Sequence, residues 1–329
     1  VFVPVISKDR KPLMPTTPDR ARNWLKKGKA TPFWSNGVFC VRLNAEPSDT
    51  KKQDIVVGID PGSKREAFTV KSEAHTYLNI LADAVTWVKD AVEARRDLRN
   101  NRRQKKTLYR QNRMNKARGG IPPSTRARWQ LKLRIVNRLR RVFPITDFVV
   151  EDIKVVTKGK RKWDVSFSPL EVGKNWFYDE LGKLGNLETR QGYETKELRD
   201  TLGLKKIGNK MSESFDAHNI DSWVLANSSV DGHTVPDNTT IKRIVPLRFH
   251  RRQLYRFNFE RGGRRRRYGG TMSLGLKKGS LVKHQEHGLC YIGGNLNGRL
   301  SIHFLNTGKR IRQDAKIEDV KFLSYSTFR

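Results

Sequence analysis

A long, strongly basic segment is the feature that most restricts how this chain can fold. Between Arg95 and Arg118 the sequence carries eleven lysines and arginines and a single acid, Asp97. The pattern after Val85 predicts a helix, but a helix of this composition cannot bury an apolar stripe within its own protein. It has to project into solvent or lie against a polyanion, and its charge density favours the polyanion. A disordered basic arm is the alternative.

The whole chain shares this excess of positive charge. Its 329 residues include 67 lysines and arginines against 33 aspartates and glutamates, a formal net charge of +34. An excess of this size requires a neutralising partner, and nucleic acid fits best. A run of ~18 apolar residues and a signal-peptide pattern are both absent, so we expect neither a membrane span nor secretion. The length allows about two domains.

Cysteine usage points to a reducing compartment. Cys40 and Cys290 are the only two cysteines of the sequence, and they form neither a disulfide framework nor a cysteine-based zinc site. We therefore expect a cytoplasmic location. Because the chain begins at Val1, we also expect its start to have been trimmed.

Short apolar runs bounded by glycine, proline and polar residues predict β-strands. These runs are Phe2–Val5, Val38–Leu43, Ile55–Asp60, Ala67–Val70, Tyr77–Leu81, Phe148–Ile153, Thr240–Phe249, Ser280–Lys283, Leu289–Ile292, Leu300–Phe304 and Val320–Leu323. Helices are expected from Pro18, after Val85, after Ser124 and over Ser212–Ala226. We interpret Pro12–Pro15 as a proline-framed loop. Residues 156–211 are polar with weak periodicity and are interpreted as an excursion from the core.

Three acids occupy positions where a carboxylate is costly unless a cation compensates it. Asp60 and Glu151 each end an apolar run. Asp221 follows His218 by three residues, which puts both on one face of a helix. Mg²⁺ prefers oxygen ligands, and two such ions held by carboxylates can clamp the attacking and leaving oxygens of a phosphodiester. Together these residues predict a metal-dependent nuclease in which His218 orients or deprotonates the attacking water.

Each of these residues also has a structural explanation when it is taken alone. Asp60 stands before Pro61-Gly62, a position typical of a turn residue. Glu151 could pair with one of the many arginines. His218 could be a polar core or surface residue. The combination in so basic a chain is more specific than its members.

Two neighbouring acids compete for the same roles. Asp152 adjoins Glu151 but should point to the opposite face of the strand. Asp216 lies off the helical face that carries Asp221. We therefore favour Glu151 and Asp221 as the functional acids.

The same residues resemble a known family. Val57–Lys64 resembles the first RuvC motif, Val149–Asp152 the second, and His218–Ser222 the third, which is usually written H-x-x-D-A. Pro12–Pro15 resembles the signature of the PLMP domain in the IscB group of transposon-encoded, RNA-guided nucleases. The arginine-rich helix resembles their bridge helix. Arg265–Gly270 and the strands that follow resemble their C-terminal domain, which reads a target-adjacent motif.

The resemblance covers nearly the whole chain in the same order and implies an α/β fold. An RNase H-like RuvC core with a mixed sheet would be split in sequence by the bridge helix. A small N-terminal PLMP domain would precede it, and an SH3-like β-barrel would follow. The implied ranges are 1–54 for the PLMP domain, 55–86, 121–155 and 212–249 for the RuvC parts, 87–120 for the bridge helix, 156–211 for a linker in place of HNH, and 250–329 for the C-terminal domain.

One departure from the IscB pattern carries a consequence for the reaction. IscB proteins hold an HNH nuclease, which needs histidine, between the second and third motifs, but this chain has no histidine between Asp152 and Asp216. It therefore resembles IsrB, the HNH-lacking branch. In this family HNH cuts the guide-paired strand and RuvC cuts the displaced strand, so the implied product is a nick in the non-target strand. Ser222 replaces the usual alanine of the third motif.

The resemblance also implies cofactors, partners and a location in the cytoplasm of a prokaryote, near the nucleoid. Asp60, Glu151 and Asp221 would bind two Mg²⁺ ions, for which Mn²⁺ can substitute, with Asp60 bridging them, and His218 would handle the water. A noncoding omega RNA would guide the protein, as a 1:1 complex with one monomer, to double-stranded DNA beside a short adjacent motif. Base pairing would then read the sequence, while the protein reads the motif and the heteroduplex backbone.

Basic side chains of two segments would grip nucleic acid without reading sequence. These are Arg95, Arg96, Arg99, Arg102, Arg103, Lys105, Lys106, Arg110, Arg113, Lys116 and Arg118 of the bridge helix, and Arg264, Arg265, Arg266 and Arg267 of the tail.

Two other functions remain open at this stage. The first is an unguided, structure-selective nuclease of the junction-resolvase type, which shares the RuvC core, acts as a homodimer and needs neither a PLMP domain nor a long arginine helix. The second is a non-catalytic basic RNA-binding protein whose acids are structural.

Overall fold

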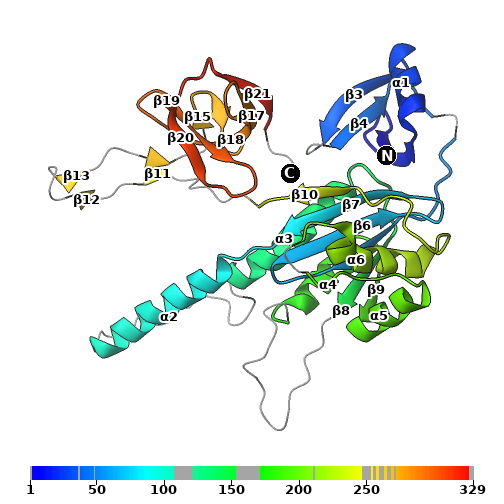
Figure 1. Cartoon of the computed structure of the whole chain (residues 1–329), viewed down its shortest axis with the longest axis horizontal. Helices are drawn as coiled ribbons and strands as arrows, with labels where there is room; N and C mark the ends of the chain where they lie inside the picture. The colour runs from blue at the N-terminus through cyan, green and yellow to red at the C-terminus, as the bar shows by residue number, and fades with distance from the viewer. Residues whose placement is uncertain are drawn as a thin grey trace, which may run out of the picture. The chain divides into compact units, whose positions relative to one another are not determined.

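The computed structural model describes residues 2–35, 38–47, 49–106, 121, 123–152, 171–209, 212–246, 253–254, 257–258, 263–264, 268–269 and 272–325. The chain divides into two compact units. The first comprises Val1–Phe33 and Phe39–Lys242, and the second comprises Trp34–Val38 and Arg243–Arg329. Figure 1 labels their helices and strands.

The first unit opens with a four-stranded sheet and one helix. Its strand order is β2-β1-β4-β3, with β1 antiparallel to β2 and parallel to β4. Thr17 caps the helix by accepting a hydrogen bond from the backbone of Arg20. The elements are β1 (Val3–Ile6), β2 (Pro12–Thr16), α1 (Pro18–Lys26), β3 (Ala30–Ser35) and β4 (Val38–Leu43).

The interpretation of Pro12–Pro15 as a loop is wrong, because these residues belong to strand β2. They pair with β1 at the edge of the sheet. Proline cannot donate a ladder hydrogen bond, so an edge strand, with one side left unpaired, is where a sheet tolerates it.

A six-stranded mixed sheet forms the centre of the first unit. Its order is β10-β7-β6-β5-β8-β9; β6 is antiparallel to both of its neighbours, β5 and β7, whereas β5, β8 and β9 run parallel. The mixed α/β architecture is as expected. The strands are β5 (Val56–Asp60), β6 (Arg65–Lys71), β7 (Thr76–Asp83), β8 (Asp147–Asp152), β9 (Asn186–Gln191) and β10 (Ile241–Ile244).

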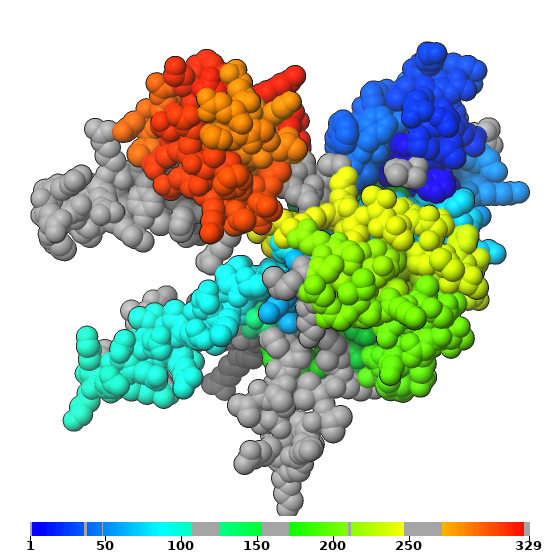
Figure 2. Space-filling view, in the orientation of Figure 1, coloured from blue at the N-terminus to red at the C-terminus, as the bar shows by residue number. Residues whose placement is uncertain are grey.

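Helix α6 (Phe215–Val230) is the most enclosed element that packs on this sheet. Leu225 and Ala226 meet Val56 of β5 and Val149 of β8 in one buried cluster. Another side of α6 packs with α5 (Gly192–Thr201) through a second buried cluster. Figure 2 shows the green and yellow-green residues of this part of the chain next to one another on one face. A helix that is apolar on several sides belongs in a core.

Two further helices of this unit are α3 (Pro123–Leu139) and α4 (Lys174–Gly182). They contact each other, and Trp129 of α3 stacks on Phe177 of α4 with ring centroids 5.0 Å apart. Both rings are buried.

Helix α2 (Val88–Gln104) is the described part of the arginine-rich segment. Val88 is the one buried residue of α2. Figure 1 shows the helix extending away from the six-stranded sheet. The expectation of a helix up to Arg118 is corrected within the described residues, because Lys105 caps α2 and Lys106 has a φ of 46°. Repulsion among the closely spaced basic side chains disfavours continuation. Residues 107–120 lie outside the described residues.

Much of 156–211, expected to be an excursion, is part of the core. Residues 171–209 hold α4, β9 and α5, and β9 adds a parallel strand beside β8. The weak periodicity has a physical reason: β9 is an edge strand of polar residues, and the two helices are short. Residues 153–170 lie outside the described residues.

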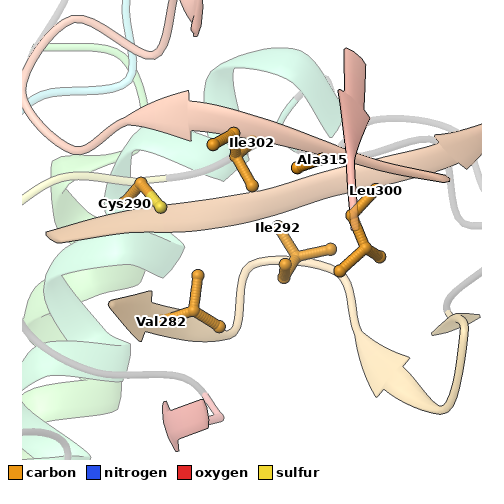
Figure 3. Packing of buried hydrophobic residues seen from close by; sticks show 6 residues of the cluster. All are labelled: Val282, Cys290, Ile292, Leu300, Ile302 and Ala315. Carbon is orange, nitrogen blue, oxygen red and sulfur yellow. The ribbon is translucent and has the colours of Figure 1, made fainter. Parts of the chain in front are cut away.

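The second unit is built mainly of antiparallel strands. Its largest sheet has the order β20-β19-β18-β17-β21. Figure 3 shows its core of Val282, Cys290, Ile292, Leu300, Ile302 and Ala315. The strands of the unit are β11 (Gln253–Leu254), β12 (Phe257–Asn258), β13 (Gly263–Arg264), β14 (Tyr268–Gly269), β15 (Met272–Ser273), β16 (Leu276–Lys277), β17 (Leu281–His284), β18 (Gly288–Leu296), β19 (Arg299–Phe304), β20 (Arg310–Ala315) and β21 (Val320–Ser324).

Within the described parts of both units, none of the helices combines the length and apolarity needed to cross a lipid bilayer.

Candidate active site

The fold brings Asp60, Glu151 and Asp221 into one electrostatic cluster. Asp60 ends β5, and Glu151 lies on the neighbouring parallel strand β8, one residue beyond the paired Ile59 and Val150. Asp221 comes from α6, which packs across β5 and β8. Residues 60, 151 and 221 are far apart in sequence, so the sheet and its helix make the cluster.

Gly58 explains how closely α6 approaches β5. A Cβ atom added at Gly58 would lie 1.9 Å from the backbone oxygen of Ser222 and 2.7 Å from the backbone nitrogen of Ala226. Only glycine permits such contact between backbones. The glycine that precedes Asp60 by two residues therefore sets how near the helix that carries Asp221 can come.

The negative charges of the three acids repel one another. Burial raises the pKa of Asp60 well above its ordinary value, and the nearby charges of Glu151 and Asp221 raise it further. Burial, followed by the charge of Asp221, also raises the pKa of Glu151. A side-chain hydrogen bond joins Asp60 to Glu151, and this bond raises the pKa of Asp60 and lowers that of Glu151.

Three residues from 171–209 complete the cluster. Arg199 Nη1 lies 2.6 Å from Asp221 Oδ1, and Lys206 Nζ donates to Asp221 Oδ2. The Thr195 hydroxyl, on the same helix as Arg199, hydrogen-bonds to Glu151. Burial alone would lower the pKa of Lys206, but the hydrogen bond to Asp221 and the charges of the other two acids raise it. Lys206 is thus a cation that contacts Asp221 and whose charge all three acids favour, while 36% of its side chain stays exposed.

The donor set fits a hard divalent cation. It consists of carboxylate oxygens, the ligands that Mg²⁺ prefers. Burial and the charges of the neighbouring acids raise the pKa of Asp60, and a cation would offset both effects. The carboxylate oxygens of the three acids do not all lie within 4.8 Å of one another. Asp221 is instead held by its contacts with Arg199 and Lys206. A bound ion would take over part of their role.

His218 is positioned by other contacts. Its Nε2 lies 2.9 Å from the carbonyl oxygen of Ser212 and 3.4 Å from Nη1 of Arg65. It shares α6 with Asp221, one turn earlier. Its role with water stays a prediction.

The competing acids point elsewhere. Asp152 faces away from the cluster and accepts hydrogen bonds from Lys174 (2.9 Å), Tyr178 (3.0 Å) and Gln191 (3.1 Å). Burial would raise its pKa, but these bonds lower it. Asp216 is exposed in the first turn of α6. The strand alternation that favoured Glu151 therefore agrees with the geometry.

Sequence reasoning missed Thr195, Arg199 and Lys206. All three follow β9, in a segment whose periodicity is weak. A signal was present: Leu198, Leu202 and Leu204 are spaced as a small apolar face, and they pack on α6.

The expected nucleic-acid contacts are described only in part. The side chains of Arg95, Arg96, Arg99, Arg102, Arg103, Lys105 and Lys106 are exposed along and just after α2. Arg264 lies in strand β13. Arg110, Arg113, Lys116, Arg118, Arg265, Arg266 and Arg267 lie outside the described residues.

One family of known proteins matches part of the chain. Residues 3–164 match the model of the family described as RRXRR protein. This family is linked to IscB- and IsrB-type nucleases. The match covers just under half of the chain and includes Asp60 and Glu151, but it ends before Asp221. Among curated proteins, no sequence matches the chain.

Proposed function

We propose that the chain is an RNA-guided, Mg²⁺-dependent DNA endonuclease that nicks the displaced strand, an HNH-lacking relative of the IscB nucleases. The observation that carries this proposal is the cluster of Asp60, Glu151 and Asp221 on two adjacent parallel strands and the helix across them. The family match over residues 3–164 supports it, because that family is linked to nucleases of this kind.

In this proposal the three carboxylates hold the metal. Asp60, Glu151 and Asp221 would bind two Mg²⁺ ions, which when bound stabilise the attacking and leaving oxygens of a phosphodiester. Thr195 fixes the orientation of Glu151 by its hydrogen bond. Arg199 and Lys206 balance the charge of Asp221 before an ion binds. His218, one helical turn before Asp221, would orient the attacking water.

The basic surfaces would bind the guide and the target. Helix α2 exposes arginines without an apolar stripe, so it suits contact with phosphates and not with a protein core. In this proposal the first four strands and α1 form the PLMP domain, the six-stranded mixed sheet is the RuvC core, and the antiparallel sheet of the second unit reads the adjacent motif. A noncoding RNA would supply the rest of the scaffold.

Because the proposed enzyme has no HNH domain, the expected product is a single nick. The described part of 153–211 holds α4, β9 and α5 and no histidine. Its residues complete the carboxylate cluster and add a strand to the sheet. A second nuclease centre in the described part of that region therefore has no support.

The proposal is tested by the RNA that purifies with the protein. The chain is expressed together with the DNA that flanks its gene, and the bound RNA is sequenced. One discrete, long RNA that maps beside the gene is the expected result. A heterogeneous mixture of host RNA, or none, together with metal-dependent cutting of branched DNA, would replace the proposal with the junction-resolvase function. Bound RNA without any metal-dependent cleavage would replace it with the non-catalytic RNA-binding function.

A further inference from the structure

Outside the carboxylate cluster, two histidines and an aspartate meet at the end of α6. One ligand atom each from His75, His233 and Asp237 lies within 4.8 Å of the others. His75 Nδ1 is 3.5 Å from Asp237 Oδ2. His75 belongs to the turn between β6 and β7, whereas the other two residues lie in the loop that follows α6. The fold, and not a local sequence motif, gathers them.

We propose that His75, His233 and Asp237 bind a divalent transition-metal ion, with Zn²⁺ the best match. Two imidazole nitrogens and one carboxylate oxygen form a three-ligand set that zinc accepts, with water in the fourth position. Imidazole favours transition metals over Mg²⁺, which prefers oxygen ligands. The site is therefore chemically distinct from the carboxylate cluster, and the proposal does not depend on the nuclease function.

Backbone groups already orient two of the ligands. His233 Nε2 donates to the carbonyl oxygen of Ala74 at 2.7 Å, which leaves the lone pair on Nδ1. Both oxygens of Asp237 accept from the backbone nitrogen of Thr76, at 3.0 and 3.2 Å. Hydrogen bonds of this kind fix the orientation of metal ligands in proteins. Burial opposes ionisation of Asp237, but the bonds from Thr76 lower its pKa, so the carboxylate is available as an anion.

The loop that carries His233 and Asp237 is held against the β6–β7 turn without an ion. Gly232 has a φ of +91°, and a Cβ atom there would lie 2.1 Å from the backbone oxygen of Glu73. Lys71 Nζ donates to the carbonyl oxygen of Asp231 at 2.5 Å. Asn79 Nδ2 donates to the carbonyl oxygen of Asn238 at 2.7 Å. An ion would therefore bind to ligands that the fold has already brought together.

The second histidine cluster among the described residues is a weaker candidate. It consists of His284, which ends β17, and of Glu286 and His287 in the turn between β17 and β18. His284 Nδ1 already accepts from the backbone nitrogens of Glu286 (3.2 Å) and His287 (3.4 Å). Glu286 also faces the guanidinium of Arg312 at 3.5 Å. This second cluster therefore serves as the control site in the experiment below.

An ion at His75, His233 and Asp237 would have a structural role. It would connect the β6–β7 turn with the loop that leaves α6, the helix that carries Asp221. Because it binds only the folded arrangement, Zn²⁺ should raise the temperature of unfolding.

The test uses the full chain, freed of nucleic acid and treated with a chelator, with Co²⁺ as the spectroscopic probe. One equivalent of Co²⁺ should give the strong visible absorption of a tetrahedral site with nitrogen ligands, and Zn²⁺ should abolish it by displacement. His75→Ala and Asp237→Asn should each weaken binding about tenfold or more. His287→Ala and Asp60→Asn should leave the absorption unchanged, since they alter the other two candidate sites.

Three results would overturn the proposal. They are the absence of a tetrahedral Co²⁺ spectrum, a spectrum that His75→Ala leaves unaltered, and a spectrum that His287→Ala or Asp60→Asn removes. Circular dichroism of each variant establishes that it is folded. His233→Gln is a second ligand variant for use if His75→Ala does not fold.

Discussion

Lys132 and Glu66 form an ion pair that is completely buried within the first unit. Their charged atoms lie 2.7 Å apart, and both side chains are 0% exposed. Burial raises the pKa of Glu66, and the ammonium of Lys132 opposes this rise. Lys132 also lies over the ring of Trp129, 4.7 Å from its centroid. A buried carboxylate of this kind stays charged only because its partner is present.

Removal of the ammonium should therefore destabilise the protein in a pH-dependent way. Lys132→Met should cost about 3–5 kcal/mol at neutral pH, because it leaves Glu66 buried without a partner. The raised pKa of Glu66 means that its favourable contribution is fully present below its unfolded value and is lost as the pH rises through the folded value. The destabilisation caused by Lys132→Met should thus be small at acidic pH, where Glu66 is protonated, and large at neutral pH. Urea unfolding followed by tryptophan fluorescence measures both.

Two control variants accompany this prediction. Lys183→Met removes the exposed lysine just after α4 and should change stability by less than about 0.5 kcal/mol. The double variant Glu66→Gln, Lys132→Met should recover much of the loss. A destabilisation that is the same at acidic and neutral pH would contradict the role given to Glu66.

Lys206 should compete with divalent ions for the carboxylate cluster. Its ammonium contacts Asp221, and Asp60 and Glu151 act on its charge. Lys206→Met removes this cation, so Mn²⁺ should bind about tenfold more tightly, an effect of about 1.4 kcal/mol. Electron paramagnetic resonance of free Mn²⁺ measures the affinity without reference to cleavage. Exposed Lys205→Met is the matched control and should bind as the wild type does. An unchanged or weaker affinity in Lys206→Met would show that Lys206 does not compete.

At the residue scale, the sequence singled out the three acids that the fold brings together, whose function stays a prediction, but not their basic partners. Asp60, Glu151 and Asp221 could be chosen because apolar strands and a helix make their positions readable. Arg199 and Lys206 could not, because the small apolar face beside them does not by itself indicate that this polar segment folds back onto α6. Long-range pairing of that kind appears only in the fold.

At the scale of elements, the contact between β5 and α6 should be the most sensitive. Gly58→Ala would place a Cβ atom 1.9 Å from the backbone oxygen of Ser222, and backbone cannot move aside as a flexible side chain can. We expect a destabilisation of about 1–3 kcal/mol or more. Separation of Asp60 from Asp221 should also reduce the proposed nicking activity.

The matched control for this contact is Gly182→Ala in α4. A Cβ atom there meets nothing within 4 Å, so the change should be neutral or stabilising by up to about 1 kcal/mol. Thermal unfolding compares the two variants. If Gly58→Ala unfolds at the same temperature as Gly182→Ala, the close approach does not control the packing of α6.

Elements with an apolar face were readable from the sequence, whereas edge elements were not. The runs at β5 and β8 are buried and apolar, and both were predicted. Strand β9 has the polar sequence of a sheet edge and was missed. Pro12–Pro15 was taken for a loop for the same reason, since an edge strand tolerates prolines.

At the scale of the whole molecule, the net charge of +34 should make binding to the proposed guide RNA strongly salt-dependent. The triple variant Arg99→Gln, Arg102→Gln, Arg103→Gln removes three exposed charges of α2. The slope of log affinity against log salt is negative, and in this variant it should become less steep by about 0.7–0.9 for each phosphate that is no longer neutralised. Filter binding over a salt series measures the slope.

The control for this prediction removes the same charge elsewhere. Lys183→Gln, Lys196→Gln and Lys205→Gln are combined in one variant, since all three side chains are exposed outside α2. Its slope should stay at the wild-type value. Equal slopes for the two triple variants would mean that RNA binding follows total charge and that α2 has no special role.

The central claim is that Asp60, Glu151 and Asp221 cut one strand of a guided DNA target, and a strand-resolved nicking assay tests it most directly. The protein with its co-purified RNA is given Mg²⁺ and a duplex labelled on each strand. We expect cleavage of the displaced strand alone, its loss in Asp60→Ala with RNA binding retained, and wild-type cleavage in Asp54→Ala, which alters an exposed acid. Nicking at the wild-type rate by Asp60→Ala, or cleavage of the guide-paired strand, would contradict the claim.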